Sequence, residues 1–315
     1  MESTRLAKYI MKKFEAHPTF SENDVGGRNE IFNHNYFLHG SESQQKSIML
    51  KSSEDRYRDE IRFPVDNYFG FSLSPFLKGK MVLDLGCFTG GRSIAWFERY
   101  RLRQISGNDI KEVYIEAAKQ FGLFHNANTD FRIGYGESLP FEDETFDAIL
   151  TFDVFEHVLN IQRTLSECYR VLKVGGRLFA VFPSYFQPIE HHLSLVTKVP
   201  CIHWFFSGET LVKAYCEILE SRGDSAYWYK RSTACLKSWE RCNTVNGTTL
   251  AQLRKLIRKM NWRVFSEFHK PLGSVGRRVS GRPFARIIGK LFLPFTYLPG
   301  LQELFIHRIT FIAEK

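Results

Sequence analysis

From Lys80 to Pro183 the sequence alternates short β-rich runs with segments of helical length, and this alternation limits the fold more than any other feature. Strands that alternate with helices along a chain pair as a parallel sheet covered by helices. The strands predicted here are 81–85, 104–109, 130–135, 146–153 and 177–183, with helices at 90–100, 111–122 and 160–173. The sequence therefore predicts an α/β fold with a doubly wound sheet.

Two of these segments have further features that support the assignment. The run FDAILTFD (146–153) is continuously apolar, as expected of a strand that is buried on both faces. The segment 160–173 places apolar residues at helical spacing, and we expect the sequence VGG (174–176) to end that helix.

The rest of the chain adds two strands and interrupts the alternation twice. A helix at 249–261 and strands at 262–268 and 307–315 bring the predicted sheet to seven strands. The first 78 residues contain no clear strand, although 41–62 predicts one or two polar helices, and the long interruption after Ser184 suggests an inserted lid at the carboxyl edge of the sheet. The predicted parts are an N-terminal helical extension (1–78), the first half of the sheet domain (79–183), the lid (184–246) and the C-terminal part of the sheet domain (247–315).

The loop DLGCFTGG (84–91) follows the first strand. A glycine-rich turn at this place binds nucleotide-type cofactors, because the backbone can approach the ligand without intervening side chains. Dinucleotide loops follow G-x-G-x-x-G, whereas positions 86, 88 and 91 are Gly, Phe and Gly here. A benzyl group at position 88 would stand where a pyrophosphate packs on the helix, so the loop disfavours a dinucleotide.

Three stretches resemble the class I S-adenosylmethionine-dependent methyltransferases. VLDLGCFTGG resembles their motif I, with Asp84, Gly86 and Gly90 matching and Phe88 departing from the usual middle glycine. The stretch 137–158 resembles the ExLPFxDxxFDxV…EHV pattern of the type 11 methyltransferase group, and 167–183 resembles its L-K-x-G-G-x-L turn. The resemblance is strong over 80–183 and weaker for the last two strands. It implies a Rossmann-like methyltransferase sheet in which residues 79–183 form the cofactor-binding half.

The resemblance also implies S-adenosyl-L-methionine as the cofactor. Asp109 lies 25 residues after Asp84, where the family's acidic residue accepts hydrogen bonds from both ribose hydroxyls. Tyr135 stands where the family commonly has an Asp that contacts adenine, so adenine recognition falls to the backbone, Tyr135 or Glu137. The cofactor-binding residues that the resemblance implies are Asp84, Gly86, Cys87, Gly90, Asp109, Ile110, Gly136, Glu137 and Asp153.

The segment DVFEHV (153–158) holds the catalytic candidates, Glu156 and His157. If 153–157 form a helical turn, Asp153, Glu156 and His157 share one face. Three interpretations stay open: His157 is a general base for a hydroxyl acceptor; the three residues bind a divalent metal, as the similar E-x-x-E-H of ubiquinone-pathway O-methyltransferases suggests; or Asp153 orients the methionine end while the other two cap the turn. We assign no metal site.

The predicted lid contains histidines and aromatic residues, each with a structural and a functional interpretation. The histidines are packing residues, or they orient an acceptor hydroxyl or contribute to a metal site, and we favour packing. The aromatic run is an apolar wall for the acceptor or plain core. These residues are His191, His192, His203, Trp204, Phe205 and Phe206.

A formal net charge of +9 suits an acidic substrate, an anionic membrane surface or nucleic acid. The segment 277–301 mixes arginines with apolar residues. It is either a peripheral membrane surface or a crossover that packs on the sheet with solvated arginines, and we favour the crossover. Nucleic acid is disfavoured, because the basic residues show no aromatic-interleaved platform.

The six cysteines contain no C-x-x-C pair, which argues for free thiols rather than a disulfide framework or thiolate zinc site. No apolar run reaches the roughly 18 residues of a membrane span, and the start does not resemble a signal peptide. We therefore predict a cytoplasmic S-adenosylmethionine-dependent methyltransferase that acts on a small-molecule acceptor, with oxygen as the nucleophile. The alternatives are an NAD-type Rossmann oxidoreductase and a non-catalytic methyltransferase-like binding subunit.

Overall fold

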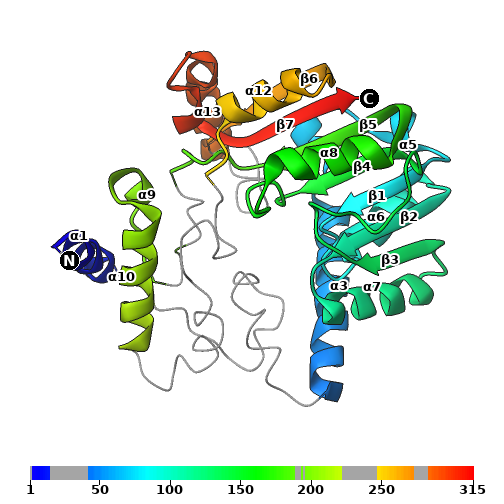
Figure 1. Cartoon of the computed structure of the whole chain (residues 1–315), viewed down its shortest axis with the longest axis horizontal. Helices are drawn as coiled ribbons and strands as arrows, with labels where there is room; N and C mark the ends of the chain where they lie inside the picture. Colours follow the sequence, from blue (N-terminus) through cyan, green and yellow to red (C-terminus); the bar gives the residue numbers. More distant parts are fainter. Residues whose placement is uncertain (1, 15–41, 189–192, 194–195, 222–246, 273–282) are drawn as a thin grey trace.

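The computed structural model describes residues 2–14, 42–188, 193, 196–221, 247–272 and 283–315. Within them lies a seven-stranded sheet of order β3-β2-β1-β4-β5-β7-β6, in which only β7 runs antiparallel to its neighbours (Figure 1). This sheet confirms the predicted fold class. The strands are β1 (Met81–Leu85), β2 (Gln104–Asp109), β3 (Thr129–Ile133), β4 (Phe146–Phe152), β5 (Leu172–Phe182), β6 (Arg263–Pro271) and β7 (Ile306–Glu314).

Helices cover both faces of the sheet, and each face has its own core cluster. Val82 and Leu150 point to one cluster, whereas their neighbours Leu83 and Ile149 point to the other, as the alternation of side chains along a strand requires. The continuously apolar run of β4 is therefore buried on both sides. The helices on the first face are α4 (Asp66–Phe69), α5 (Ser74–Leu77), α6 (Gly91–Tyr100) and α7 (Glu112–Phe124), and those on the second are α8 (Ile161–Val171) and α12 (Leu250–Lys259).

The predicted end of the helix before β5 is wrong. Helix α8 ends at Val171, and β5 begins at Leu172, so VGG (174–176) lies inside the strand. Leu172 pairs with Phe146 and the next paired residue, Arg177, faces Ala148, which leaves the glycines in an irregularity of the ladder. Gly175 donates a 3.1 Å backbone hydrogen bond to Lys315, and Gly176 accepts one of 3.0 Å from it. A glycine run can end a helix or mark an irregularity in a strand, and here contacts with the distant C-terminal residue select the strand.

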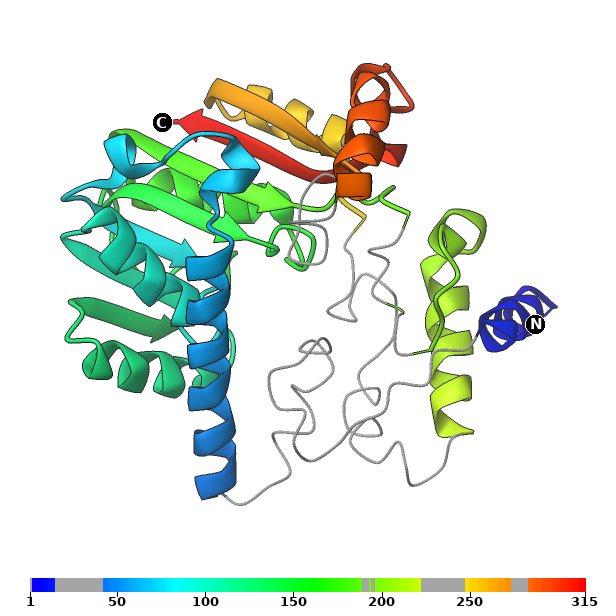
Figure 2. The same cartoon turned by 180° about the vertical axis from the view of Figure 1, so that it is seen from behind.

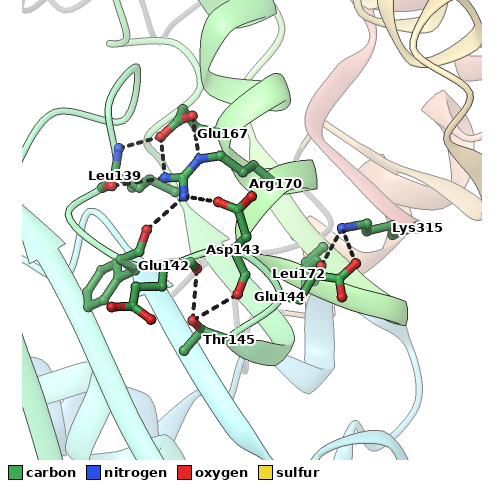
Figure 3. Close-up of polar contacts among 10 residues, drawn as sticks. Leu139, Glu142, Asp143, Glu144, Thr145, Glu167, Arg170, Leu172 and Lys315 are labelled. Atoms are coloured by element: carbon green, nitrogen blue, oxygen red, sulfur yellow. Dashed lines mark hydrogen bonds and ion pairs between the residues drawn. The ribbon is translucent and has the colours of Figure 1, made fainter.

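The predicted loop between β3 and β4 is tied to α8 by Arg170 (Figure 3). Its guanidinium donates to the backbone oxygens of Leu139 and Phe141 and to the carboxylates of Asp143 and Glu167, at distances between 2.7 and 3.1 Å. Because a guanidinium has five N–H donors in a fixed fork, one side chain can hold the whole loop. These contacts explain the Asp of the LPFxD stretch, since the other two bonds to the stretch go to backbone oxygens.

The polar segment predicted at 41–62 forms one helix, α3 (Glu42–Arg62), which packs on α6 and α7. Glu60 in its last turn is 4% exposed, accepts a 2.6 Å hydrogen bond from the backbone nitrogen of Val65, and lies 3.5 Å from Arg92 on α6. Burial raises the pKa of Glu60 to about 7. A titratable carboxyl is thus buried where α3 meets the helix that follows the glycine loop.

The first helix, α1 (Glu2–Lys13), was not predicted and packs on α10 (Gly208–Glu220), in the region predicted to be a lid. Ala7 and Met11 join Leu211 and Ala214 in a cluster, and Lys8 forms a 2.9 Å ion pair with Glu217 at the surface. Figures 1 and 2 both place α1, α10 and the short α9 (Ile202–Phe205) beyond the carboxyl ends of β1–β5. Two segments far apart in the chain therefore meet on the side where parallel sheets bind ligands.

Between β6 and β7 the chain forms α13 (Pro283–Phe292) and the 3-10 turns η3 (Pro294–Tyr297) and η4 (Gln302–Leu304), where a crossover was predicted. Of the helices in the described ranges, none has both the length and the apolar character needed to cross a bilayer.

Candidate active site

The glycine loop lies against the ends of β2 and β4. The backbone nitrogens of Gly86 and Cys87 each donate a 3.0 Å hydrogen bond to the carbonyl oxygen of Asn108 at the end of β2. Gly86 has φ +77°, and a Cβ added there would lie 2.4 Å from a methyl carbon of Val154, just after β4. Only glycine combines this left-handed conformation with so close an approach.

Phe88 occupies the position of the middle glycine in a left-handed conformation, with φ +51°. Such a conformation costs a residue with a Cβ about 1–2 kcal/mol. The ring packs edge to face on Tyr114 of α7, with centroids 4.5 Å apart, and joins a small cluster with Met49 of α3. Packing against these two helices offsets the backbone strain and holds the ring on the side of α3 and α7.

Asp109 joins the end of β2 to the loop. Its Oδ2 accepts a 3.1 Å hydrogen bond from the backbone nitrogen of Phe88, and its Oδ1 accepts a 3.3 Å bond from that of Lys111. Burial raises the pKa of Asp109 above its ordinary value. Since an ionised carboxylate offers about four lone-pair sites, the two backbone bonds orient it and leave room for two further donors.

The segment after β3 reaches the same corner. The backbone nitrogen of Gly134 donates a 3.0 Å hydrogen bond to the carbonyl oxygen of Asp109. The side-chain nitrogen of Asn108 donates a 3.1 Å hydrogen bond to the carbonyl oxygen of Gly134. The chain then turns back, with the nitrogen of Ser138 donating to the oxygen of Tyr135, and the Tyr135 side chain is 60% exposed. Ile110, next to Asp109, is 47% exposed. An exposed ring and an exposed aliphatic side chain are thus available near this corner.

Glu137 and Gly136 have structural contacts that the sequence did not predict. The Glu137 carboxylate accepts a 3.0 Å hydrogen bond from the backbone nitrogen of Asn160, the N-cap of α8. A Cβ on Gly136 would lie 3.2 Å from Thr164 of the same helix. Both residues hold the turn against α8, and their predicted contact with the cofactor stays a prediction.

Asp84 and Cys87 are buried inside the loop. Asp84 is 3% exposed and accepts a 2.6 Å hydrogen bond from the hydroxyl of Ser93 in α6, while burial raises its pKa to about 6. Cys87 packs over Gly107 of β2. A Cβ added to Gly107 would lie 2.7 Å from the Cβ of Cys87. These contacts shape the loop from inside, and the predicted role of both residues in cofactor binding stays untested.

The assumed helical turn at 153–157 is wrong. Asp153 is left-handed, with φ +56°, and its Oδ1 lies 3.1 Å from the Nε of Arg308 on β7. The turn starts one residue later, where the nitrogen of His157 donates to the oxygen of Val154 at 2.8 Å. Glu156 is 2% exposed, and its Oε1 lies 3.8 Å from the Nε2 of His157. The structure thus pairs Glu156 with His157 and Asp153 with Arg308.

The metal interpretation of these three residues finds no geometric support. In the part of the chain that the structure describes, no three His, Cys, Asp or Glu side chains are grouped as ligands for a metal ion. Asp153 instead forms an ion pair with Arg308 of β7, while Glu156 lies next to His157.

Two arginines at this edge were missed by sequence reasoning. Arg308 is the only basic residue inside the apolar run of β7, and that isolation was a signal for a role at the site. Arg92, in the first turn of α6, stacks over the ring of Phe152 at the end of β4, 4.0 Å from its centroid. Nothing in the local sequence pattern pairs Arg92 with that ring.

In the lid, His203 is 4% exposed and its Nε2 lies 2.8 Å from the backbone oxygen of Tyr185, which supports the favoured packing interpretation. Phe206 packs on the cluster formed by α1 and α10, whereas Phe205 is 76% exposed. Of the other predicted lid histidines, His191 and His192 lie outside the described residues.

Comparison with known proteins agrees with this geometry. Residues 83–180 match a family model described as a methyltransferase domain. The chain is 35% identical over 106 residues to the ubiquinone biosynthesis O-methyltransferase of Mesorhizobium japonicum, covering 33% of this chain and 41% of that protein. The protein of the same name from Coxiella burnetii is 34% identical over 103 residues, covering 33% and 43%. The matches thus span less than half the length of these relatives.

Among solved structures, the chain is similar to an S-adenosylmethionine dependent methyltransferase from Mesorhizobium loti, with a TM-score of 0.50 and 11% identity, over 76% of this chain and 93% of that one. At this identity the likeness concerns the fold alone. Residues 83–180 thus match a methyltransferase domain, and the sheet order is that of the class I methyltransferase fold.

Proposed function

We propose that this protein transfers a methyl group from S-adenosylmethionine to an oxygen atom of a small-molecule acceptor. The observation that carries the proposal is the Asp109 carboxylate, oriented by the backbone N–H groups of Phe88 and Lys111 where the glycine loop meets β2. A carboxylate held in this way can accept hydrogen bonds from both hydroxyls of a ribose. Oxygen as the nucleophile is supported by the relatives, which are named O-methyltransferases.

The residues present fit the proposed cofactor. The loop offers backbone rather than side chains at Gly86 and Gly90, and the exposed Ile110 and Tyr135 offer apolar surface beside Asp109 for a base. The cofactor supplies an activated methyl group on a sulfonium, and most of the acceleration of such a displacement comes from aligning the two reactants. The protein therefore needs to bind, orient and exclude water.

The pair Glu156–His157 supplies the remaining chemistry. A hydroxyl acceptor must lose its proton as the new bond forms, and a positioned imidazole can take it. His157 is anchored by its backbone bond to Val154, and the buried Glu156 carboxylate at 3.8 Å would stabilise the imidazolium. Asp153, held by Arg308, would orient the methionine end of the cofactor.

Calorimetric titration distinguishes this proposal from its alternatives. We expect the protein to bind S-adenosylmethionine and S-adenosylhomocysteine, and to bind NAD far more weakly, because Phe88 replaces the glycine that lets a pyrophosphate approach the backbone. Binding of NAD but neither sulfur nucleoside would indicate an oxidoreductase. Binding of none of the three would indicate a subunit without a cofactor and would end the proposal.

Replacing His157 with Ala should lower kcat by about 100-fold or more, the usual contribution of a general base. The affinity for S-adenosylhomocysteine should stay within about twofold, since the proposed role of His157 lies in the chemical step. The matched control is His125→Ala, at the end of α7, where His125 pairs with Glu98. Turnover that survives in His157→Ala, or falls equally in the control, would remove His157 from the mechanism.

The cytoplasmic location stays a prediction, and so does the free state of all six cysteines. Four of them, Cys87, Cys168, Cys201 and Cys216, are free thiols, and the other two lie outside the described residues.

A further inference from the structure

The segment that connects β6 to β7 along the chain carries an exposed apolar surface. The segment contacts β6 of the sheet, as the favoured crossover interpretation requires, yet most of its large apolar side chains from α13 to η4 are between 42% and 64% exposed. Large contiguous apolar surfaces on a soluble domain usually mark a site of interaction. We call this surface the 287–301 patch, and its members are Ile287, Leu291, Leu293, Phe295, Tyr297, Leu298 and Leu301.

The charged residues in the sequence around the patch are all basic. Between Pro271 and Glu303 the sequence contains five basic residues and no acidic one. One of the five, Lys290, is exposed and lies within the patch, next to Leu291. The basic residues are Arg277, Arg278, Arg282, Arg286 and Lys290. A partner that covers this segment must therefore accept both apolar side chains and positive charge.

We propose that the 287–301 patch docks on an anionic lipid bilayer surface. Apolar side chains that enter the acyl boundary, combined with cations that face anionic headgroups, give reversible binding to a membrane surface. Phe295 and Tyr297 add aromatic rings, and the ring of Tyr297 carries the polar tip that suits the interface. A second copy of this chain is a poorer partner, because it would bring another exposed Lys290, in a segment without acidic residues, against the first.

The position of the patch agrees with such a role. Figures 1 and 2 show α13 at one corner of the molecule, on the side to which the carboxyl ends of β1–β5 point. Docking there would hold the edge of the sheet that carries the candidate site close to the membrane. The proposal nevertheless does not depend on the proposed function, since it rests on exposure and charge alone.

Flotation of the full-length protein with vesicles tests the proposal. We expect binding to vesicles of phosphatidylcholine with phosphatidylglycerol at low salt, a loss of binding at high salt, and far weaker binding to phosphatidylcholine alone. The double variant Leu291→Ser/Phe295→Ser should bind at least about tenfold more weakly. Lys290→Glu should bind roughly fivefold or more weakly, since each cation near an anionic surface contributes to affinity.

The matched control is Leu123→Ser/Phe124→Ser. These side chains are 76% and 72% exposed at the far end of α7. The control should bind vesicles like the unchanged protein. All variants should bind S-adenosylhomocysteine with equal affinity, so a failure of the membrane proposal can be distinguished from a failure of the proposed function. Absent binding at low salt, equal losses in the control, or a dimer that only the patch variant dissociates would each overturn the proposal.

Discussion

Replacing Asp109 with Asn is expected to weaken the binding of S-adenosylhomocysteine by more than about 100-fold. Hydrogen bonds to a charged group are worth about 1.5–3 kcal/mol each, and a ribose diol makes two of them. Asn keeps the size of Asp but offers one acceptor oxygen, and the backbone nitrogens of Phe88 and Lys111 already require acceptors. The side-chain NH2 group of the Asn would therefore face one of these N–H donors, or one ribose hydroxyl would lose its acceptor.

The matched control for this variant is Asp130→Asn. Asp130 lies on the neighbouring strand β3, where its carboxylate forms a partly exposed ion pair with Arg132. Exposed pairs contribute little to stability, so this variant should keep both its melting temperature and its affinity. Titration calorimetry gives the affinities and thermal unfolding reports the fold. An Asp109→Asn protein that folds and binds within about threefold of the unchanged protein would refute the assignment of Asp109.

The second large effect is expected from Gly90→Ala, which should destabilise the protein by about 2–4 kcal/mol. Gly90 has φ +75°, and an added Cβ would lie 2.7 Å from the Cβ and 2.9 Å from the Cα of Ala118 on α7. The left-handed conformation costs an alanine about 1 kcal/mol, and overpacking adds about 1–3 kcal/mol. Because α6 and α7 must separate to make room, binding of S-adenosylhomocysteine should weaken as well.

Gly79→Ala isolates the cause of this effect. Gly79 has almost the same conformation, φ +71°, but nothing lies within 4 Å of an added Cβ. Gly79→Ala should therefore lower the free energy of unfolding only by the conformational cost, about 1 kcal/mol. Urea unfolding of both variants gives the comparison. If the two variants lose the same free energy of unfolding, the close contact between the glycine loop and α7 is not what requires glycine at position 90.

The sequence alone determined the sheet and the position of the glycine loop. Period-two apolar runs and glycine turns are local signals, so β1 to β7 could be placed before any contact was known. Asp109, the last residue of β2, was singled out by the family resemblance, and its contact with the cofactor stays a prediction. The glycines at 86 and 90 were expected because a ligand approaches the loop backbone, whereas the structure gives a packing reason, in contacts with Val154 and Ala118.

Only the tertiary structure decided which distant residues meet. The pairing of Asp153 with Arg308, the packing of α1 on α10 and the exposure of the 287–301 patch all join or separate residues through space. Periodicity reports which face of an element is apolar, but it does not report what covers that face. The start of β5 shows the same limit, because glycines predicted to end a helix lie in a strand and exchange backbone hydrogen bonds with Lys315, 139 or more residues further along the chain.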